Sequence, residues 1–276
     1  MYLFTSAGVL SHLITRINSV KWGGKFSTRF SVRNGVRQGA VSYPLLFSVY
    51  IDDLFHLLRS SGLGCYISSI FFACFGYADD LLLLSASRSG LQELVKICEK
   101  FAKRKGLKFS TNVDPVKSKT KCIIFSKKKV DSRRVAQILL NGDPLPWVSD
   151  VKHLGNVLQC DNKMNIDLTQ KRGKLIGKLN SLSQEFHYVD PNVFVKILNI
   201  YATSFYGSSL WDIFSKECEK IYNSWNVAIR ICYQVDRCTH RYLIEELSES
   251  LHPKVMLCSR YVSFQQALLR CDKLPV

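Results

Sequence analysis

The spacing of apolar residues along the chain predicts a series of amphipathic helices. From Pro44 to Leu58 apolar side chains recur every three or four residues, and the run ends at Ser60-Ser61-Gly62. This period places the apolar residues on one face of a helix, which is buried in a folded domain. The same argument predicts further helices over residues 2–18, 89–105, 166–187, 190–205, 215–232 and 253–270.

Strands are expected mainly in the first part of the chain. The apolar stretch Cys65 to Tyr77 and the run Leu81 to Ser85 flank a tight turn at Ala78 to Asp80. Two apolar strands joined in this way form a hairpin whose tip carries the acidic residues. Asn141-Gly142 is a dipeptide that strongly favours a turn, and it lies within a second, smaller β element.

The change from mixed elements to helices alone predicts an α+β fold. We place a domain boundary near residue 164, which gives domains over residues 1–164 and 165–276. No membrane span is expected, because the longest apolar stretch, Ile67 to Leu84, is interrupted by two serines and two aspartates.

Positive charge is in excess and is concentrated in one segment. The chain has 38 lysines and arginines against 22 acidic residues, a formal net charge of +16. Between Lys96 and Arg134 fourteen basic residues accompany only three acidic ones. Such a patch favours a polyanionic partner such as nucleic acid, although a merely soluble basic protein is the alternative.

Asp79 and Asp80 are the strongest candidates for chemistry. In-line phosphoryl transfer uses two divalent cations about 4 Å apart, and these hard ions require carboxylate oxygens. Adjacent aspartates at a turn also commonly accept backbone N–H groups, which is the structural alternative. Asp52-Asp53 fits that alternative, because it lies within a predicted helix. The apolar runs that flank Asp79 favour a turn that faces a solvent-filled cleft.

Several motifs, in order, resemble those of the reverse transcriptases of non-LTR (LINE-type) retrotransposons. Tyr77-Ala78-Asp79-Asp80 resembles the YADD box of reverse transcriptases, and Gly35-Val36-Arg37-Gln38-Gly39 resembles the preceding motif of the LINE-type enzymes. His153-Leu154-Gly155 is similar to their primer-gripping turn, and Tyr206-Gly207 to part of their thumb. A maturase or telomerase-like relative is a weaker alternative, because the sequence of the Gly35 to Gly39 box resembles that of the LINE-type enzymes.

The resemblance implies a fold and an activity. It implies a polymerase-type palm, an antiparallel sheet with packed helices, in residues 1–164, followed by an α-helical thumb in residues 165–276. The implied function is RNA-directed DNA polymerase activity, in which deoxynucleoside triphosphates are added to the 3′-hydroxyl of a DNA primer on an RNA template. The implied cofactor is Mg²⁺, or Mn²⁺ in its place, and the implied site of action is the nucleus.

Residue roles follow from the same resemblance. Asp79 would be a catalytic metal ligand with Asp80 as its weaker neighbour, and Tyr77 would pack beside the primer end. Lys117 or Lys119 would approach the triphosphate, with plain solvation as the alternative for both. The template and the nascent base pair would lie along Arg37, Gln38 and Gly39, and the primer would be gripped by His153, Leu154 and Gly155.

A row of lysines in the helical region adds a candidate contact with a phosphate backbone. Lys171, Lys174 and Lys178 recur at i, i+3 and i+7, so they lie on one face of the predicted helix. A solvated helix face is equally compatible with this spacing.

One feature of the family is missing, and it leaves two hypotheses. The family places another metal-binding aspartate before the glycine-rich box, together with its fingers, whereas this sequence has no Asp or Glu before Asp52. The first hypothesis is a reverse transcriptase fragment that is inactive alone and works within a longer product. The second is a catalytically inactive retrotransposon remnant that binds nucleic acid through its basic patch.

Overall fold

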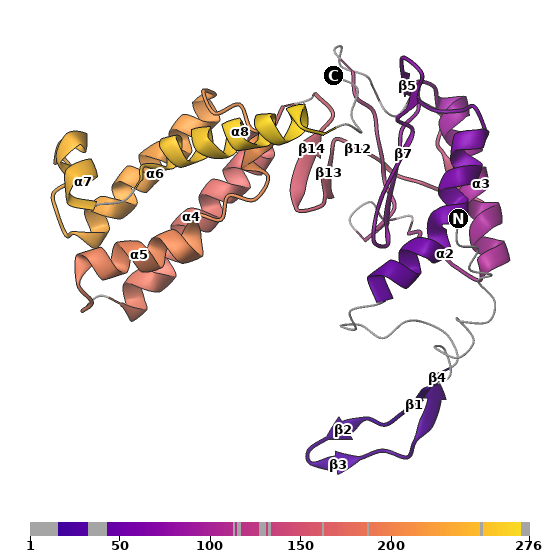
Figure 1. Ribbon diagram of the computed structural model, residues 1–276, viewed down its shortest axis with the longest axis horizontal. Coiled ribbons are helices and arrows are strands. Elements are labelled where there is room, and N and C mark those ends of the chain that lie inside the picture. Colours follow the sequence, from indigo (N-terminus) through magenta and orange to yellow (C-terminus); the bar gives the residue numbers. More distant parts are fainter. Residues whose placement is uncertain are drawn as a thin grey trace. The chain divides into compact units, whose positions relative to one another are not determined.

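The computed structural model describes residues 16–32, 43–112, 114, 117–126, 131, 134–161, 163–186, 188–248 and 251–271. Within these ranges the chain forms seven α-helices, one short 3-10 helix and small two-stranded sheets, nearly all antiparallel (Figure 1). The predicted mixture of helices and strands is therefore confirmed. Two compact units, Met1–Phe109 and Ser110–Val276, make up the chain. No helix in the part that the structure describes is long and apolar enough to cross a membrane.

Two helices form the frame of the first unit and confirm their predicted positions. Helix α2 spans Tyr43–Ser60 and helix α3 spans Arg88–Lys105. They lie side by side (Figure 1), and the Tyr50 hydroxyl of α2 donates a hydrogen bond to the carbonyl of Lys105. Ser87 caps the start of α3 by accepting from the Gly90 N–H group. The core between them contains Leu54, Leu58, Ala73, Leu94, Cys98 and Phe101.

The strands of the first unit are short and differ from the prediction in one place. The stretch Cys65 to Tyr77 is not one strand, because Ser68 has a φ of 54° and reverses the chain. It forms strands β5 (Tyr66–Ile67), β6 (Ile70–Phe71) and β7 (Cys74–Tyr77), of which β5 and β6 pair with each other. Strand β8 (Asp80–Leu83) returns antiparallel to β7, as predicted.

The N-terminal part carries a β-ribbon whose first strand lies at the end of a predicted helix. Strand β1 (Arg16–Asn18) pairs with β4 (Phe30–Val32), so the prediction of a helix over residues 2–18 is wrong at its last three positions. Strand pairing with a distant segment is a tertiary effect that the local apolar period does not contain. Residues 2–15 lie outside the described ranges. The Gly23-Gly24 turn joins strands β2 (Lys21–Trp22) and β3 (Lys25–Phe26).

The second unit begins with three strand pairs. Strand β9 (Cys122–Ile123) pairs in parallel with β12 (Trp147–Val148). Strands β10 (Leu139–Leu140) and β11 (Asp143–Pro144) flank the predicted Asn141-Gly142 turn. Strands β13 (Asp150–His153) and β14 (Asn156–Gln159) form a hairpin with the loop Leu154-Gly155.

Helices make up the rest of the second unit. The four predicted helices are present as α4 (Asn165–Glu185), α5 (Pro191–Ala202), α6 (Lys216–Cys232) and α8 (Pro253–Leu269). A 3-10 helix, η2 (Ser208–Leu210), and the eight-residue helix α7 (Arg241–Ser248) were not predicted, because both are too short to show a clear period.

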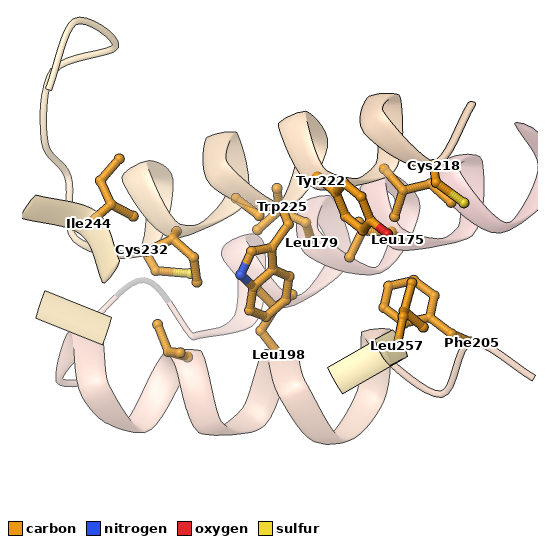
Figure 2. Packing of buried hydrophobic residues seen from close by; sticks show 14 of the residues in the cluster. Leu175, Leu179, Leu198, Phe205, Cys218, Tyr222, Trp225, Cys232, Ile244 and Leu257 are labelled. Carbon is orange, nitrogen blue, oxygen red and sulfur yellow. The ribbon is translucent and has the colours of Figure 1, made fainter. Parts of the chain in front are cut away.

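The core of the second unit lies between α4, α5 and α6. Trp225 of α6 is 2% exposed and projects among apolar side chains that include Leu179 of α4 and Leu198 of α5 (Figure 2). Asp190 caps α5 by accepting from the N–H groups of Asn192 and Val193. This helical core supports the β13–β14 hairpin, which packs against α4.

Candidate active site and nucleic-acid interface

The hairpin β7–β8 presents the two candidate carboxylates at its tip. Tyr77 and Asp80 face each other in the strand register, so Ala78 and Asp79 form a two-residue loop. Ala78 has a φ of 51°, in the left-handed region that the first position of such loops requires. Tyr77, Ala78, Asp79 and Asp80 are all exposed, and Tyr77 is 67% exposed. The turn chemistry therefore holds the charges away from the apolar core.

Close packing on helix α2 fixes the base of this hairpin. Strand β7 contains Gly76, and a Cβ atom added there would lie only 2.3 Å from Cζ of Phe55. Only glycine allows the strand to approach the ring this closely. On the returning strand, Leu81 and Leu83 pack against the core cluster of the unit. The hairpin is thus anchored by apolar contacts below its acidic tip.

The carboxylates of Asp79 and Asp80 differ from the other acidic pair of this unit in having no partner. Within the described residues neither side chain takes part in a hydrogen bond or an ion pair. By contrast, Asp52 lies 3.5 Å from His56 Nε2, and Asp53 lies 3.0 Å from Lys105 Nζ. The hydrogen bond from Lys105 lowers the pKa of Asp53. Among these four aspartates, only Asp79 and Asp80 remain available to bind an external cation.

The donor set at the tip suits a hard divalent cation, although it is small. Carboxylate oxygens are the ligands that Mg²⁺ takes, and Mg²⁺ is commonly held by only one or two protein carboxylates together with substrate phosphates and water. Across the described ranges no cluster of three or more His, Cys, Asp or Glu side chains could hold a metal. Asp79 and Asp80 therefore fit a site that substrate phosphates complete.

Only some of the other residues expected near the substrate lie within the described ranges. Arg37, Gln38 and Gly39 lie outside the described residues. Lys117 and Lys119 belong to the second unit, and both are exposed. Between them Ser118 is 3% exposed and donates to the carbonyl of Thr120 at 2.6 Å, so this short segment turns both lysines outward. Lys117 Nζ is 4.0 Å from Asp114 Oδ2.

The turn His153-Leu154-Gly155 is built differently from the acidic one. It joins β13 to β14 through Leu154 and Gly155, whose φ angles are 45° and 81°. Lys171 Nζ of helix α4 donates to the carbonyl oxygen of Gly155 at 3.2 Å. A side chain from another element therefore fixes the orientation of this loop.

A buried aspartate completes the support of that turn. Asp167 is 1% exposed, and its Oδ1 accepts from the Val157 N–H group at 3.2 Å. The same oxygen lies 3.9 Å from Lys171 Nζ. Burial lowers the pKa of Lys171, an effect that the charge of Asp167 opposes. Neither this role of Asp167 nor its burial was predicted, and the i, i+4 spacing to Lys171 was the available signal.

The three lysines of α4 do not have the same surroundings. Lys171 is held by Gly155 and Asp167, with its side chain 10% exposed. Lys174 and Lys178 are exposed. The positive charges of Lys174 and Lys152 also lower the pKa of Lys171, which indicates a basic cluster around the turn. The structure thus brings Lys171 to the predicted primer-gripping turn and leaves Lys174 and Lys178 open to a ligand.

Comparison with known proteins agrees with these motifs. Residues 3–157 match the model of the family described as reverse transcriptase (RNA-dependent DNA polymerase). Over 160 residues, 56% of the chain, the sequence is 28% identical to a retrovirus-related Pol polyprotein from the type-1 retrotransposable element R1 of Bradysia coprophila. Over 161 residues it is 27% identical to the corresponding R2 polyprotein of Popillia japonica.

These alignments cover a small part of each relative. The chain spans 14% of the R1 polyprotein and 24% of the R2 polyprotein. The family match includes the acidic hairpin and ends just after the His153-Leu154-Gly155 turn, so helix α4 and the later helices lie beyond it. Because the match extends over more than half of this sequence, the chain belongs to the reverse transcriptase family, with relatives among the non-LTR retrotransposon polyproteins.

Proposed function

We propose that this chain carries the nucleotidyl-transfer centre of a reverse transcriptase of the non-LTR type. In the proposed reaction a DNA primer 3′-hydroxyl attacks the α-phosphate of a deoxynucleoside triphosphate on an RNA template, and pyrophosphate leaves. The observation that carries the proposal is the pair Asp79 and Asp80, exposed and unpartnered among the described residues on a two-residue turn. That turn lies within the family-matched region.

Asp79 is assigned as a metal ligand for Mg²⁺ or Mn²⁺, and Asp80 as its weaker neighbour. When bound, such an ion stabilises the negative charge that develops on phosphoryl oxygens. The chain contributes two carboxylates that no cation of the protein neutralises in the described structure. Because both are exposed already, they can bind an ion without a large desolvation penalty for the folded protein.

The remaining assignments concern the nucleic acid. Tyr77, opposite Asp80 in the register, is assigned to the primer end. The loop His153-Leu154-Gly155 grips the primer, and Lys174 and Lys178 contact its phosphates, because these two lysines are exposed and have no ion pair within the described residues. Template contact is assigned to Arg37, Gln38 and Gly39, and triphosphate contact to Lys117 or Lys119.

We also propose a functional division of the chain. Residues 1–164 act as a polymerase palm and residues 165–276 as a thumb, a division that differs from that of the compact units, which meet between Phe109 and Ser110. The strand pairs β9–β12 and β13–β14 belong to the second compact unit, together with the helices. A nuclear site of action is part of the proposal through the family resemblance alone.

Primer extension on an RNA template with Mg²⁺, by the chain within a longer product that supplies the upstream metal-binding aspartate, tests the role of Asp79. Asp79→Ala should reduce extension on the order of a thousandfold, because a lost metal ligand removes several kcal/mol of charge stabilisation. Asp52→Ala is the matched control, since Asp52 is another exposed aspartate of the same unit. Its activity should stay at the level of the unmodified chain. Equal extension by the unmodified chain and Asp79→Ala would overturn the assignment.

A second candidate function is favoured by the basic patch, in which fourteen lysines and arginines lie between Lys96 and Arg134. In this alternative the protein is a retrotransposon remnant that binds nucleic acid but does not extend primers. Extension absent from both the unmodified chain and Asp79→Ala, with RNA binding that weakens steeply as salt rises, would support it. Extension by the unmodified chain would exclude it.

A further inference from the structure

A hollow in the second unit lies beside the exposed ring of Tyr206. It has a volume of about 400 Å³ and is bounded by the segment before and within η2 and by one side of helix α8. This is the size range of small-molecule sites, about 300–1,000 Å³. It is lined by five serines, among them Ser204 and Ser263, by Tyr206, Gly207 and Arg260, and by two phenylalanines, Phe205 and Phe264.

The charge in this hollow is positive and uncompensated. Arg260 Nη1 donates to the carbonyl of Ser204 at 2.8 Å, and its Nη2 donates to the carbonyl of Thr203 at 3.4 Å. No carboxylate lines the hollow, and Arg260 has no ion pair within the described residues. Two carbonyls thus orient the guanidinium, which keeps further N–H donors. A fixed guanidinium among hydroxyl groups matches the oxygens of a phosphate group.

Tyr206 is exposed yet held in place. Its side chain is 60% exposed, while a Cβ atom added to Gly155 would lie 3.1 Å from the ring. Lys171 Nζ lies 5.6 Å from the ring centroid, a cation–π contact. The next residue, Gly207, packs so closely on the side-chain amide of Asn156 that an added Cβ would overlap it. The ring is therefore an aromatic surface that loses little freedom when a ligand binds.

We propose that Tyr206 and Arg260 form a binding site for one nucleotide of a nucleic-acid strand. The phosphate occupies the hollow at Arg260, and the base or sugar packs on the Tyr206 ring. Aromatic stacking and a guanidinium–phosphate contact are the two elements by which proteins hold single strands without sequence preference. The proposal rests on the proposed function, because it assumes that the protein binds nucleic acid, and it adds a site outside the family-matched residues.

The test measures binding of the full chain to a fluorescent oligothymidylate by anisotropy over a range of salt concentrations. Tyr206→Ala should weaken binding about fivefold or more, because a stacked base contributes at least about 1 kcal/mol. Tyr206→Phe should keep the affinity. Arg260→Gln should make the slope of log K against log salt less steep by about 0.7, the value for one phosphate contact on a single strand.

Matched controls and a second charge variant keep the test decisive. Tyr201→Ala removes another tyrosine of the unit, 61% exposed on α5, and Arg270→Gln removes an exposed arginine at the end of α8. Neither should change binding. Arg260 also donates to two carbonyls, so Arg260→Gln could unfold the protein. In that case Ser263→Glu provides the test, because it adds a negative charge at the hollow and leaves the hydrogen bonds of Arg260 in place. It should weaken binding with the same loss of slope.

The outcomes separate this site from the function on which it rests. No binding of the oligothymidylate by the unmodified chain would overturn the site, and primer extension decides separately whether the proposed function stands. Strong binding that is unchanged in Tyr206→Ala, Arg260→Gln and Ser263→Glu would overturn the site and leave the proposed function standing. Equal losses in the target variants and in Tyr201→Ala and Arg270→Gln would also overturn it, because they would indicate diffuse charge and surface effects.

Discussion

Two hairpin loops of this protein each begin with a residue of positive φ and have opposite surroundings. The β7–β8 loop begins at Ala78 with a φ of 51°, and the β13–β14 loop begins at Leu154 with a φ of 45°. The first presents Asp79 and Asp80 to solvent without a partner in the described structure. The second is held from behind by Lys171 and the buried Asp167.

The difference separates two uses of charge. At the acidic loop the charges are left for a ligand, so they should contribute to chemistry and little to folding. At the other loop the charges are buried and held by the protein, apart from Asp167 Oδ2, which has no hydrogen-bond partner among the described residues, so they should contribute to folding and to the placement of the loop. Replacing the exposed Asp79 should therefore change activity and leave stability nearly unchanged, whereas replacing the buried Asp167 should lower stability.

The largest effect on stability is expected at Asp167. Asp167→Ala should lower the free energy of unfolding of the second unit by about 3 kcal/mol, because it leaves the Val157 N–H group without its acceptor and the Lys171 ammonium without its counter-charge. Asp79→Ala should change stability by less than about 0.5 kcal/mol. Urea unfolding followed by circular dichroism measures both. The contrast fails if Asp167→Ala is as stable as the unmodified chain.

A smaller effect distinguishes Lys171 from its neighbour on α4. Lys171→Met should cost about 2 kcal/mol, because the charged hydrogen bond to Gly155 and the counter-charge of the buried Asp167 are both lost while the apolar packing of the stem is kept. Hydrogen exchange at the amides of residues 154–157 should become faster. Lys174→Met, at an exposed position, should leave stability and exchange unchanged and should reduce the salt dependence of RNA binding by about one phosphate contact. Identical behaviour of the two variants would remove the distinction.

The smallest effect concerns the backbone of the acidic loop. Ala78→Gly should raise the free energy of unfolding by about 0.5–1 kcal/mol, because glycine adopts the left-handed conformation without the Cβ clash that alanine has there. Ala86→Gly, at an exposed position without a positive φ, is the control and should be neutral or destabilising. Thermal unfolding of both variants measures the difference. A less stable Ala78→Gly variant would show that the loop geometry is wrongly assigned.

Much of the fold was predictable because it depends on local pattern. The apolar period located α2, α3, α4, α5, α6 and α8 to within a few residues. The motif around Asp79 predicted the acidic hairpin, since apolar runs on both sides of a short acidic turn leave few other arrangements. Pairing between distant segments was not predictable in this way, as β1 and β4 show.

The supporting residues of the candidate site could not be predicted for the same physical reason. Asp167 appears in the sequence as an ordinary acidic residue in the first turn of a helix, and its burial depends on the hairpin that packs over it. Lys171 appeared equivalent to Lys174 and Lys178 from their spacing alone. Likewise, Tyr206 and Arg260 are 54 positions apart and border one hollow only because η2 lies against α8.

Iron-directed cleavage shows whether Asp79 and Asp80 hold the divalent cation. Fe²⁺ replaces Mg²⁺ with primer–template and a nucleoside triphosphate present, because substrate phosphates supply the remaining ligands. Added hydrogen peroxide is reduced by the bound Fe²⁺ to hydroxyl radical, ascorbate returns the ion to Fe²⁺, and the radicals cut the nearest backbone. We predict cleavage at the β7–β8 loop that disappears in the double variant Asp79→Asn, Asp80→Asn. Unchanged cleavage in that variant, or none at this loop in the unmodified chain, would show that Asp79 and Asp80 do not hold the cation.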